Sequence, residues 1–361
     1  MLATLSSPAS GRRPSHKISR NDILAHAYAL CRSNKGAAGV DGQDFTEIEA
    51  YGLERWLGEL ALALGDETYR PDPIRRVYIP KANGKLRPLG ISTLRDRVCM
   101  TAVTLVLQPI FEADLPPEQY AYRPGRNAQQ AAVEVEELLF RGHREVVDAD
   151  LADFFGSIPH TELMKSVARR VVDRRVLHLI KMWLECAVEE TDDRGRKRRT
   201  TEARDNGCGI PQGSPLSPLL ANLYMRRFVL GWEKLGLRHS LGSRIVTYAD
   251  DLVILCRGGK AEEALHWMHK LMGKLKLTVN AEKTRICIAF KVVRIAASPR
   301  NERAIALGEA GSHARQSGNP LCFGNVRLSA SMTSASSWRV FDKGYARLTG
   351  MEPCAITAAT R

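Results

Sequence analysis

Residues 244–256 read RIVTYADDLVILC, and this stretch decides the fold. Residues 245–248 and 252–255 are apolar or β-branched, so they predict two buried strands joined by a turn. Two adjacent carboxylates, Asp250 and Asp251, lie at the bend. An Asp-Asp pair is ordinary in a surface turn. Here the pair lies at the edge of a core, where like charges repel unless a cation neutralises them. The hairpin therefore predicts either a cation site or a plain turn.

A second group of acids precedes this hairpin by about 100 residues. Residues 145–160 read EVVDADLADFFGSIPH, and Asp148, Asp150 and Asp153 follow an apolar strand. Magnesium prefers carboxylate oxygens and keeps positions for water and phosphate. Two such ions, bridged by acids from neighbouring strands, can activate a hydroxyl and stabilise a leaving pyrophosphate. For Asp148 and Asp153 taken singly, a solvated strand end is the simpler explanation.

A third segment is a glycine-rich turn that leads into an apolar helix. Residues 207–225 read GCGIPQGSPLSPLLANLYM, with prolines that fix the chain before the helix. Gly207, Gly209 and Gly213 permit close approach of the backbone to a neighbour. Such a turn can receive a phosphate or a nucleotide, although a structural turn explains it equally.

Hydrophobic periodicity predicts the remaining elements. We expect helices over residues 22–32, 46–64, 94–112, 161–187 and 260–276, and a helix that Asn127 caps and that ends near Phe140. Val77 to Ile79 predict a short strand, followed by a hairpin turn at Asn83-Gly84. The polar residues 189–206 predict an exposed hairpin or loop.

In their order along the chain, these segments resemble the group II intron-encoded reverse transcriptases, within the wider retron-type group. The resemblance covers residues 36–286 and rests on these motifs: GAAGVDG (36–42), RRVYIPKANGKLRPLGISTLRDRV (75–98), AYRPGRNAQQA (121–131), DADLADFF (148–155), GIPQGSPLSPLLAN (209–222), YADD (248–251) and LTVNAEKT (277–284). It implies an α+β fold with the fingers and palm of a right-hand polymerase. The antiparallel palm sheet would be backed by helices, and the thumb would be missing or incomplete.

The resemblance also implies the residues of the site. Asp150 and Asp250 would be the main ligands of two Mg²⁺ ions, with Mn²⁺ as a substitute and Asp251 as a supporting acid. The incoming nucleotide would be bound by a larger set: Arg75, Lys81 and Arg87 on its triphosphate, Phe155 against the sugar 2′ position, Gln212 against the sugar, and Lys283 as a proton donor to pyrophosphate. For Phe155 the alternative is a core side chain, and for Lys283 a solvated one.

The chain is expected to divide into four parts. Residues 1–20 would be a disordered tail, and residues 21–135 the N-terminal extension and fingers. Residues 136–289 would form the palm, with fingers and palm interleaved in space. Residues 290–361 depart from the family and lose periodicity, so we expect them to be poorly ordered. A divergent short C-terminus and a shifted or truncated reading frame both explain that loss.

Composition bears on partners and compartment. The formal charge of +13, from 53 Lys and Arg against 40 Asp and Glu, favours a polyanionic partner, although it equally serves solubility. No apolar run reaches the ~18 residues of a membrane helix. The 8 cysteines form no CxxC pair, so a zinc site is not expected. Several lie within apolar runs, as small buried thiols do, which fits a reducing compartment and a bacterial cytoplasmic location. A Ser- and Arg-rich N-terminus leaves an organellar location as the alternative.

The function predicted from these observations is RNA-directed DNA polymerase. Its partners would be an RNA template such as intron RNA, a DNA primer or target, and deoxynucleoside triphosphates. Two alternatives remain open: an RNA-binding maturase that assists intron splicing, and an inactive remnant of a mobile element.

Overall fold

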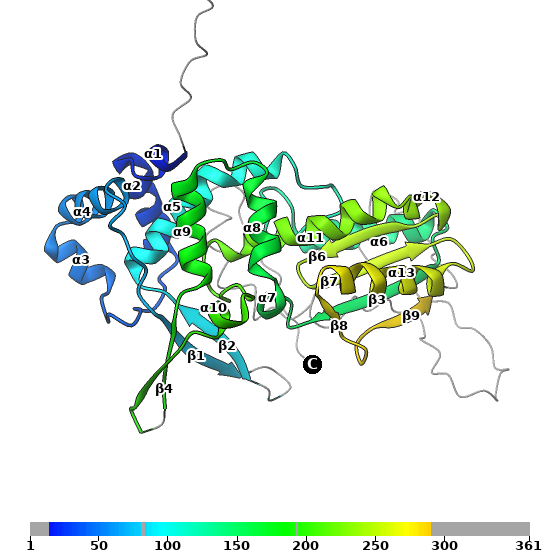
Figure 1. Cartoon of the computed structure of the whole chain (residues 1–361). Coiled ribbons are helices and arrows are strands. Elements are labelled where there is room, and N and C mark those ends of the chain that lie inside the picture. The colour runs from blue at the N-terminus through cyan, green and yellow to red at the C-terminus, as the bar shows by residue number, and fades with distance from the viewer. Residues whose placement is uncertain (1–13, 81–83, 85, 193, 290–361) are drawn as a thin grey trace, which may run out of the picture. The chain divides into compact units, whose positions relative to one another are not determined.

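The computed structural model describes residues 14–80, 84, 86–192 and 194–289. Contacts divide these residues into two compact units, one of residues 14–115 and 155–224 and the other of residues 116–154 and 225–289. Each combines helices with a sheet (Figure 1), so the α+β class is confirmed. The assignment of fingers to 21–135 and palm to 136–289 stays a prediction, because contacts define units and not polymerase subdomains. Residues 290–361 lie outside the described residues.

The first unit packs helices beside a four-stranded sheet of order β2-β1-β4-β5. Strands β1 and β2 are antiparallel, whereas β1 and β4 are parallel. The elements of this unit are α1 (Pro14–Ile18), α2 (Asn21–Ser33), α3 (Phe45–Tyr51), α4 (Leu53–Gly65), β1 (Ile74–Pro80), β2 (Leu86–Ile91), α5 (Leu94–Glu112), α8 (His160–Ala168), α9 (Arg174–Leu184), β4 (Val188–Thr191), β5 (Lys197–Thr200) and α10 (Glu202–Asn206).

Three predictions for this unit need correction. Residues 14–18, expected in the tail, form α1, because Ile18 is buried and the Ser15 N–H donates to the Asp173 carboxylate at 2.9 Å. The helix expected over 46–64 is two helices, because Gly52 has a φ of 106°. The helix expected over 161–187 is also interrupted, and Asp173 caps its second half by accepting from the Arg175 N–H at 3.1 Å.

The hairpin predicted after Val77 is confirmed, and its strands are longer than expected. β1 runs to Pro80 and pairs with β2 from Arg75↔Ile91 to Pro80↔Leu86. Pro80 is tolerated because it ends the strand. Gly84, in the connection between Pro80 and Leu86, has a left-handed φ of 77°, which glycine adopts at little cost. Lys81 and Asn83 lie outside the described residues.

The second unit contains the sheet that carries the predicted catalytic acids. Its strand order is β6-β7-β3-β8, β9 also pairs with β3, and every pairing is antiparallel. The elements are α6 (Ala128–Phe140), β3 (Glu145–Ala152), α12 (Leu237–Ser240), β6 (Arg244–Tyr248), β7 (Asp251–Cys256), α13 (Ala261–Lys274), β8 (Thr278–Val279) and β9 (Arg285–Ile288). Two helices span the unit boundaries, α7 (Phe154–Ser157) and α11 (Ser217–Lys234).

The sheet of this unit is packed against helices. Every residue of β7 is buried, and α6 and α13 pack on the sheet (Figure 1). Ala264, Met268 and Met272 of α13 are fully buried. Burial of each large apolar side chain stabilises the fold by about 1.5–3 kcal/mol. The antiparallel sheet backed by helices is therefore as predicted. None of the described helices combines the length and the apolar character needed to cross a membrane.

Candidate active site

The turn that carries Asp250 is the tightest connection a hairpin permits. Tyr248 of β6 pairs with Asp251 of β7, which leaves Ala249 and Asp250 as the loop. Ala249 has a φ of 56°, and two-residue hairpin turns need such a left-handed residue. An alanine there costs on the order of 1 kcal/mol. The fold accepts this strain at the point where Asp250 is presented, as is common at functional sites.

Strand register brings the third acid beside this turn. Asp150 of β3 lies opposite Asp251 of β7, and the Leu151 N–H donates to the Asp250 carbonyl at 3.3 Å. Directly opposed residues place their Cβ atoms about 4.5–5.5 Å apart on one face of the sheet. Asp150 and Asp251 are each only 6% exposed. The backbone thus brings Asp150 beside the adjacent pair Asp250 and Asp251, which lies about 100 residues later in the chain.

The carboxylate of Asp150 has two side-chain partners. Lys283 donates through Nζ to Oδ2 at 3.0 Å, and Asn280 donates through Nδ2 to the same oxygen at 3.2 Å. The Lys283 side chain is 60% exposed, whereas that of Asp150 is 8% exposed. Lys283, predicted as a proton donor, therefore lies in contact with a predicted metal ligand.

The neighbouring acids occupy different surroundings. Asp148 lies opposite Arg285 of β9. Burial raises the pKa of Asp148, the Arg285 charge lowers that pKa, and the Asp150 charge raises it. Asp153 is exposed and has a left-handed φ of 44°, which Asp tolerates better than most residues. The explanation of a solvated strand end therefore fits Asp153, which is exposed. It does not fit Asp148, which is only partly exposed.

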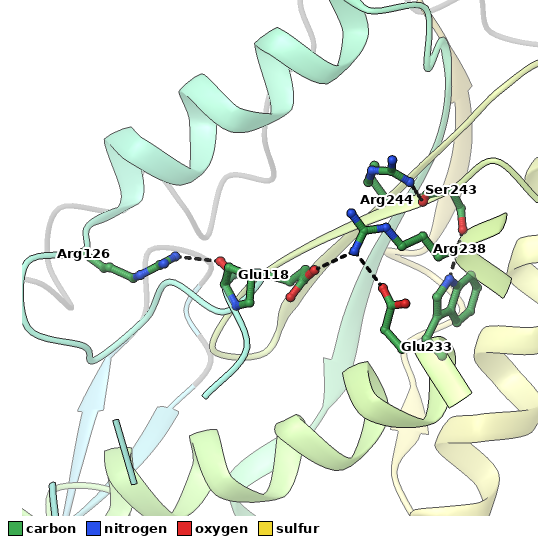
Figure 2. Close-up of polar contacts among 8 residues, drawn as sticks. Glu118, Arg126, Glu233, Arg238, Ser243 and Arg244 are labelled. Atoms are coloured by element: carbon green, nitrogen blue, oxygen red, sulfur yellow. Dashed lines mark hydrogen bonds and ion pairs between the residues drawn. The ribbon is translucent and has the colours of Figure 1, made fainter. Parts of the chain in front are cut away.

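Residues 116–126 support β6, the strand before the turn that carries Asp250. The Thr247 N–H donates to the Glu118 carbonyl at 2.8 Å, and the Tyr120 N–H donates to the Thr247 carbonyl at 3.0 Å. Figure 2 shows Arg238 between Glu118 and Glu233, at 3.8 and 3.1 Å from their carboxylates. The two backbone hydrogen bonds hold β6 at Thr247, the residue before Tyr248.

Two arginines of the AYRPGRNAQQA motif hold that support in place. Arg123 is buried and donates through Nη1 to the carbonyls of Pro116 and Gln119 at 2.7 and 2.8 Å. Arg126 donates to the Pro117 carbonyl at 2.6 Å (Figure 2). Both therefore organise the chain locally.

In the first unit, Arg87 and Gln212, both predicted to bind the nucleotide, contact each other. Arg87 of β2 donates through Nε to the Gln212 side-chain carbonyl at 3.1 Å. The Gly90 N–H donates to the Gln212 backbone carbonyl at 2.7 Å, so the glycine-rich turn lies along the edge of β2. A Cβ on Gly213, whose φ is 108°, would lie 2.5 Å from the Gly90 carbonyl oxygen. Only glycine allows this approach.

The remaining predicted residues are placed as follows. Arg75 lies on β1 opposite Ile91. Its Nε is buried and has no hydrogen-bond partner among the described residues. Phe155 lies in α7, half-buried, and its carbonyl accepts from the Ile210 N–H at 2.8 Å. Lys81 is outside the described residues.

The donor set suits a hard divalent cation in its chemistry. Carboxylates that neighbouring strands hold side by side repel one another unless a cation neutralises them. As the side chains are oriented, however, no three His, Cys, Asp or Glu side chains in the described ranges form a metal-binding group. Asp150 instead contacts Lys283 and Asn280. The three acids fit a cation by residue type and backbone position, although as oriented their side chains do not form one metal-binding group.

Comparison with known families decides the assignment. The sequence matches the family described as reverse transcriptase (RNA-dependent DNA polymerase) over residues 79–316, more than half of the chain. This chain belongs to the reverse transcriptase family. The match continues past Arg285, where the motif-based resemblance was expected to end. Members of the family use divalent metal ions in general and bind nucleic acid.

Individual relatives of this reverse transcriptase agree. The chain is 35% identical over 311 residues to protein YkfC of Escherichia coli (strain K12), an alignment that covers 74% of this chain and 77% of YkfC. It is 33% identical over 215 residues to the group II intron-encoded protein LtrA of Lactococcus lactis subsp. cremoris. That alignment covers 58% of this chain and only 34% of LtrA. The predicted kinship with intron-encoded reverse transcriptases is confirmed.

Similar solved structures include the partial Cas6-RT-Cas1--Cas2 complex, at 24% identity and a TM-score of 0.43, covering 76% of this chain and 44% of that one. Another is apo telomerase from Candida tropicalis, at 11% identity and a TM-score of 0.48, covering 61% of this chain and 45% of that one.

Asn280 is the residue that sequence reasoning missed. It lies in the LTVNAEKT motif, and an Asn directly after a short strand reads as an ordinary turn residue. Its contact with Asp150 spans 130 residues of sequence, so local pattern gives no sign of it. The available signal was its position three residues before Lys283, a residue already predicted to lie at the site.

Proposed function

We propose that this chain catalyses RNA-templated DNA synthesis at Asp150, Asp250 and Asp251. The reaction would be in-line attack of a primer 3′-hydroxyl on the α-phosphate of a deoxynucleoside triphosphate, with release of pyrophosphate. The observation that carries the proposal is the register of β3 on β7, in which Asp150 lies opposite Asp251 and beside the Asp250 turn. Family membership supplies the reaction class.

The three acids would hold two Mg²⁺ ions, for which Mn²⁺ is the expected substitute. When bound, the cations would favour deprotonation of the 3′-hydroxyl and neutralise charge that develops on the phosphates. Burial of Asp150 and Asp251 keeps these carboxylates out of bulk water, which strengthens their attraction for a cation. Paired strands fix the backbone positions of both acids, so cation binding would require no movement of the strands.

The nucleotide would be bound by the fingers residues and the glycine-rich turn. Arg75, Lys81 and Arg87 would bind the triphosphate, because a guanidinium fork matches phosphate oxygens. Gln212 would lie against the sugar, and its bond to Arg87 supports a shared role. Phe155 would exclude a 2′-hydroxyl. Lys283 would give a proton to the leaving pyrophosphate.

The proposed partners are an RNA template, such as intron RNA, and a DNA primer or target. The excess of basic residues supports a polyanionic partner. We also expect a bacterial cytoplasmic location. Cysteines of the described ranges, including buried Cys31, Cys99 and Cys256, are free thiols, as a reducing compartment favours.

Primer extension on poly(A) with oligo(dT), with and without Mg²⁺, tests the proposal. We expect extension by the parent chain that requires the metal, and none by Asp250→Ala, which should still fold and bind RNA. Asp153→Ala is the matched control, because Asp153 is an exposed acid outside the proposed set. RNA binding by a parent chain that never extends a primer would contradict the proposal and favour the maturase alternative.

A further inference from the structure

Asn280 follows β8 and opens the turn that leads to β9. Its backbone N–H donates to the Asp150 carbonyl at 2.8 Å, and its Nδ2 donates to Asp150 Oδ2 at 3.2 Å. The same residue therefore contacts both the main chain and the carboxylate of Asp150. No feature of the proposed reaction requires Asn280 to touch a substrate.

Asn280 also organises the turn that carries Lys283. Its side-chain Oδ1 accepts from the Glu282 N–H at 3.2 Å. Its backbone carbonyl accepts from the N–H groups of Lys283 and Thr284 at 3.3 and 2.9 Å. An Asn side chain that bonds the backbone two residues on is a typical turn former. One residue, through its side chain and its backbone, thus connects the position of Asp150 to that of Lys283.

The two donors to Asp150 differ in what they are able to fix. Lys283 is a long side chain that is 60% exposed, so it has considerable rotamer freedom to lose when it is held. Asn280 is short, less exposed, and held at its backbone by β3. Both donate to Oδ2, and a fixed Oδ2 sets the direction of Oδ1. The amide, and not the ammonium, is therefore suited to fix the rotamer of the carboxylate.

We propose that Asn280 is a positioning residue that holds the Asp150 carboxylate in the orientation from which it binds a divalent cation. The inference rests on the proposed function, because it presumes that Asp150 is a metal ligand. Hydrogen-bond partners of metal-binding side chains orient them, and their loss typically weakens metal affinity about 10–100-fold.

The substitution Asn280→Ser isolates this role. A serine hydroxyl still accepts from the backbone two residues on, so it preserves the turn, but it is too short to reach Asp150. Glu282→Gln is the matched control, because Glu282 is exposed and lies in the same turn. The first measurement is Mn²⁺ binding by electron paramagnetic resonance, without primer or nucleotide. The second is the Mg²⁺ concentration for half-maximal primer extension.

We expect Asn280→Ser to weaken Mn²⁺ binding and to raise the Mg²⁺ requirement by about 10-fold or more, with excess Mg²⁺ restoring extension. The control should match the parent in both measurements. Thermal unfolding reports whether each variant is folded, and a structural role alone would lower stability without changing the metal dependence of the folded fraction.

If Asp150→Asn abolishes Mn²⁺ binding while Asn280→Ser matches the parent, the inference about Asn280 is wrong and the proposed function stands. If Asp150→Asn has no effect on Mn²⁺ binding, both are wrong.

Discussion

Asp96 is almost completely buried at 1% exposure, yet it carries an ionisable group. Its carboxylate accepts from the Tyr69 hydroxyl and from the Asp72 N–H at 3.1 Å. The Trp183 Nε1–H donates to the Tyr69 oxygen at 2.9 Å. Burial raises the pKa of Asp96 to about 6, although these hydrogen bonds lower it. The site therefore favours the neutral acid.

This shift predicts a pH dependence of stability. Between about pH 4 and pH 6 the folded chain keeps a proton on Asp96 that the unfolded chain has lost. The free energy of unfolding should thus fall as the pH rises through this range, by up to about 3 kcal/mol, and stay level above it. Asp96→Asn should lack this contribution. Urea unfolding of the parent and of Asp96→Asn at about pH 4.5 and about pH 7 checks this prediction. If the free energy of unfolding changes equally with pH in both proteins, the prediction is wrong.

Phe155 gives a prediction about sugar selectivity. If its ring lies against the sugar 2′ position, Phe155→Val should open space there and raise incorporation of ribonucleotides relative to deoxynucleotides. Phe140→Val is the control, because Phe140 is a 55% exposed ring on α6. Primer extension with competing dNTPs and rNTPs measures the ratio. Unchanged selectivity in Phe155→Val would leave Phe155 as a packing residue.

At the scale of elements, the glycine-rich turn packs closely on β2. Gly207 and Gly213 both have positive φ values, 60° and 108°. A Cβ on Gly207 would meet nothing within 4 Å, whereas one on Gly213 would lie 2.5 Å from the Gly90 carbonyl oxygen. Gly207→Ala should therefore cost about 1–2 kcal/mol from backbone strain. Gly213→Ala should cost a further ~1–3 kcal/mol from overpacking.

Urea unfolding of the two alanine variants separates these effects. Gly213→Ala should also weaken the edge hydrogen bond between the Gly90 N–H and the Gln212 carbonyl, and with it the contact of Gln212 with Arg87. Its Michaelis constant for dNTPs should therefore rise more than that of Gly207→Ala. Equal stabilities for the two variants would show that the turn moves away from β2 without cost.

Elements with local signals were predictable from sequence. Asn127 begins α6 as expected, and Gln130 completes a capping box with it. The hairpin of β6 and β7 followed from uninterrupted apolar arms around two acids. By contrast, Gly52 stands in a strongly helical stretch, where an isolated glycine is tolerated. Its φ of 106° ends one helix there, and the sequence pattern alone gave no sign of this break.

The candidate site was predictable to a similar extent. The three acids followed from the motifs, and the strand pairing places Asp150 opposite Asp251; their role in catalysis stays a prediction. The pairing of β8 and β9 with β3 was not predictable, because strands of two and four residues carry too few positions to show alternation. That pairing is what brings Asn280 and Lys283 to Asp150.

At the scale of the whole molecule, the formal charge of +13 favours a polyanionic partner. The β4–β5 hairpin carries both signs. The described acids of this hairpin are paired: Glu189 with Lys197 and Arg199, Glu190 with Arg76, and Asp192 with Arg196. Arg194 and Arg198 are exposed, and within the described ranges no acid lies at salt-bridge distance from them. They are therefore available to a polyanion.

A partner with a phosphate backbone should neutralise these two cations and release the counterions that screen them. The double variant Arg194→Gln/Arg198→Gln should then bind single-stranded RNA more weakly. Its plot of log affinity against log salt should be shallower by up to about 1.4, since each lost phosphate contact removes about 0.7 from the slope. Arg55→Gln/Arg141→Gln is the control with the same change in net charge, because both arginines lie in helical ion pairs. Fluorescence anisotropy over a series of KCl concentrations measures both slopes. Equal slopes for the two double variants would mean that net charge alone, and not the β4–β5 hairpin, attracts the nucleic acid.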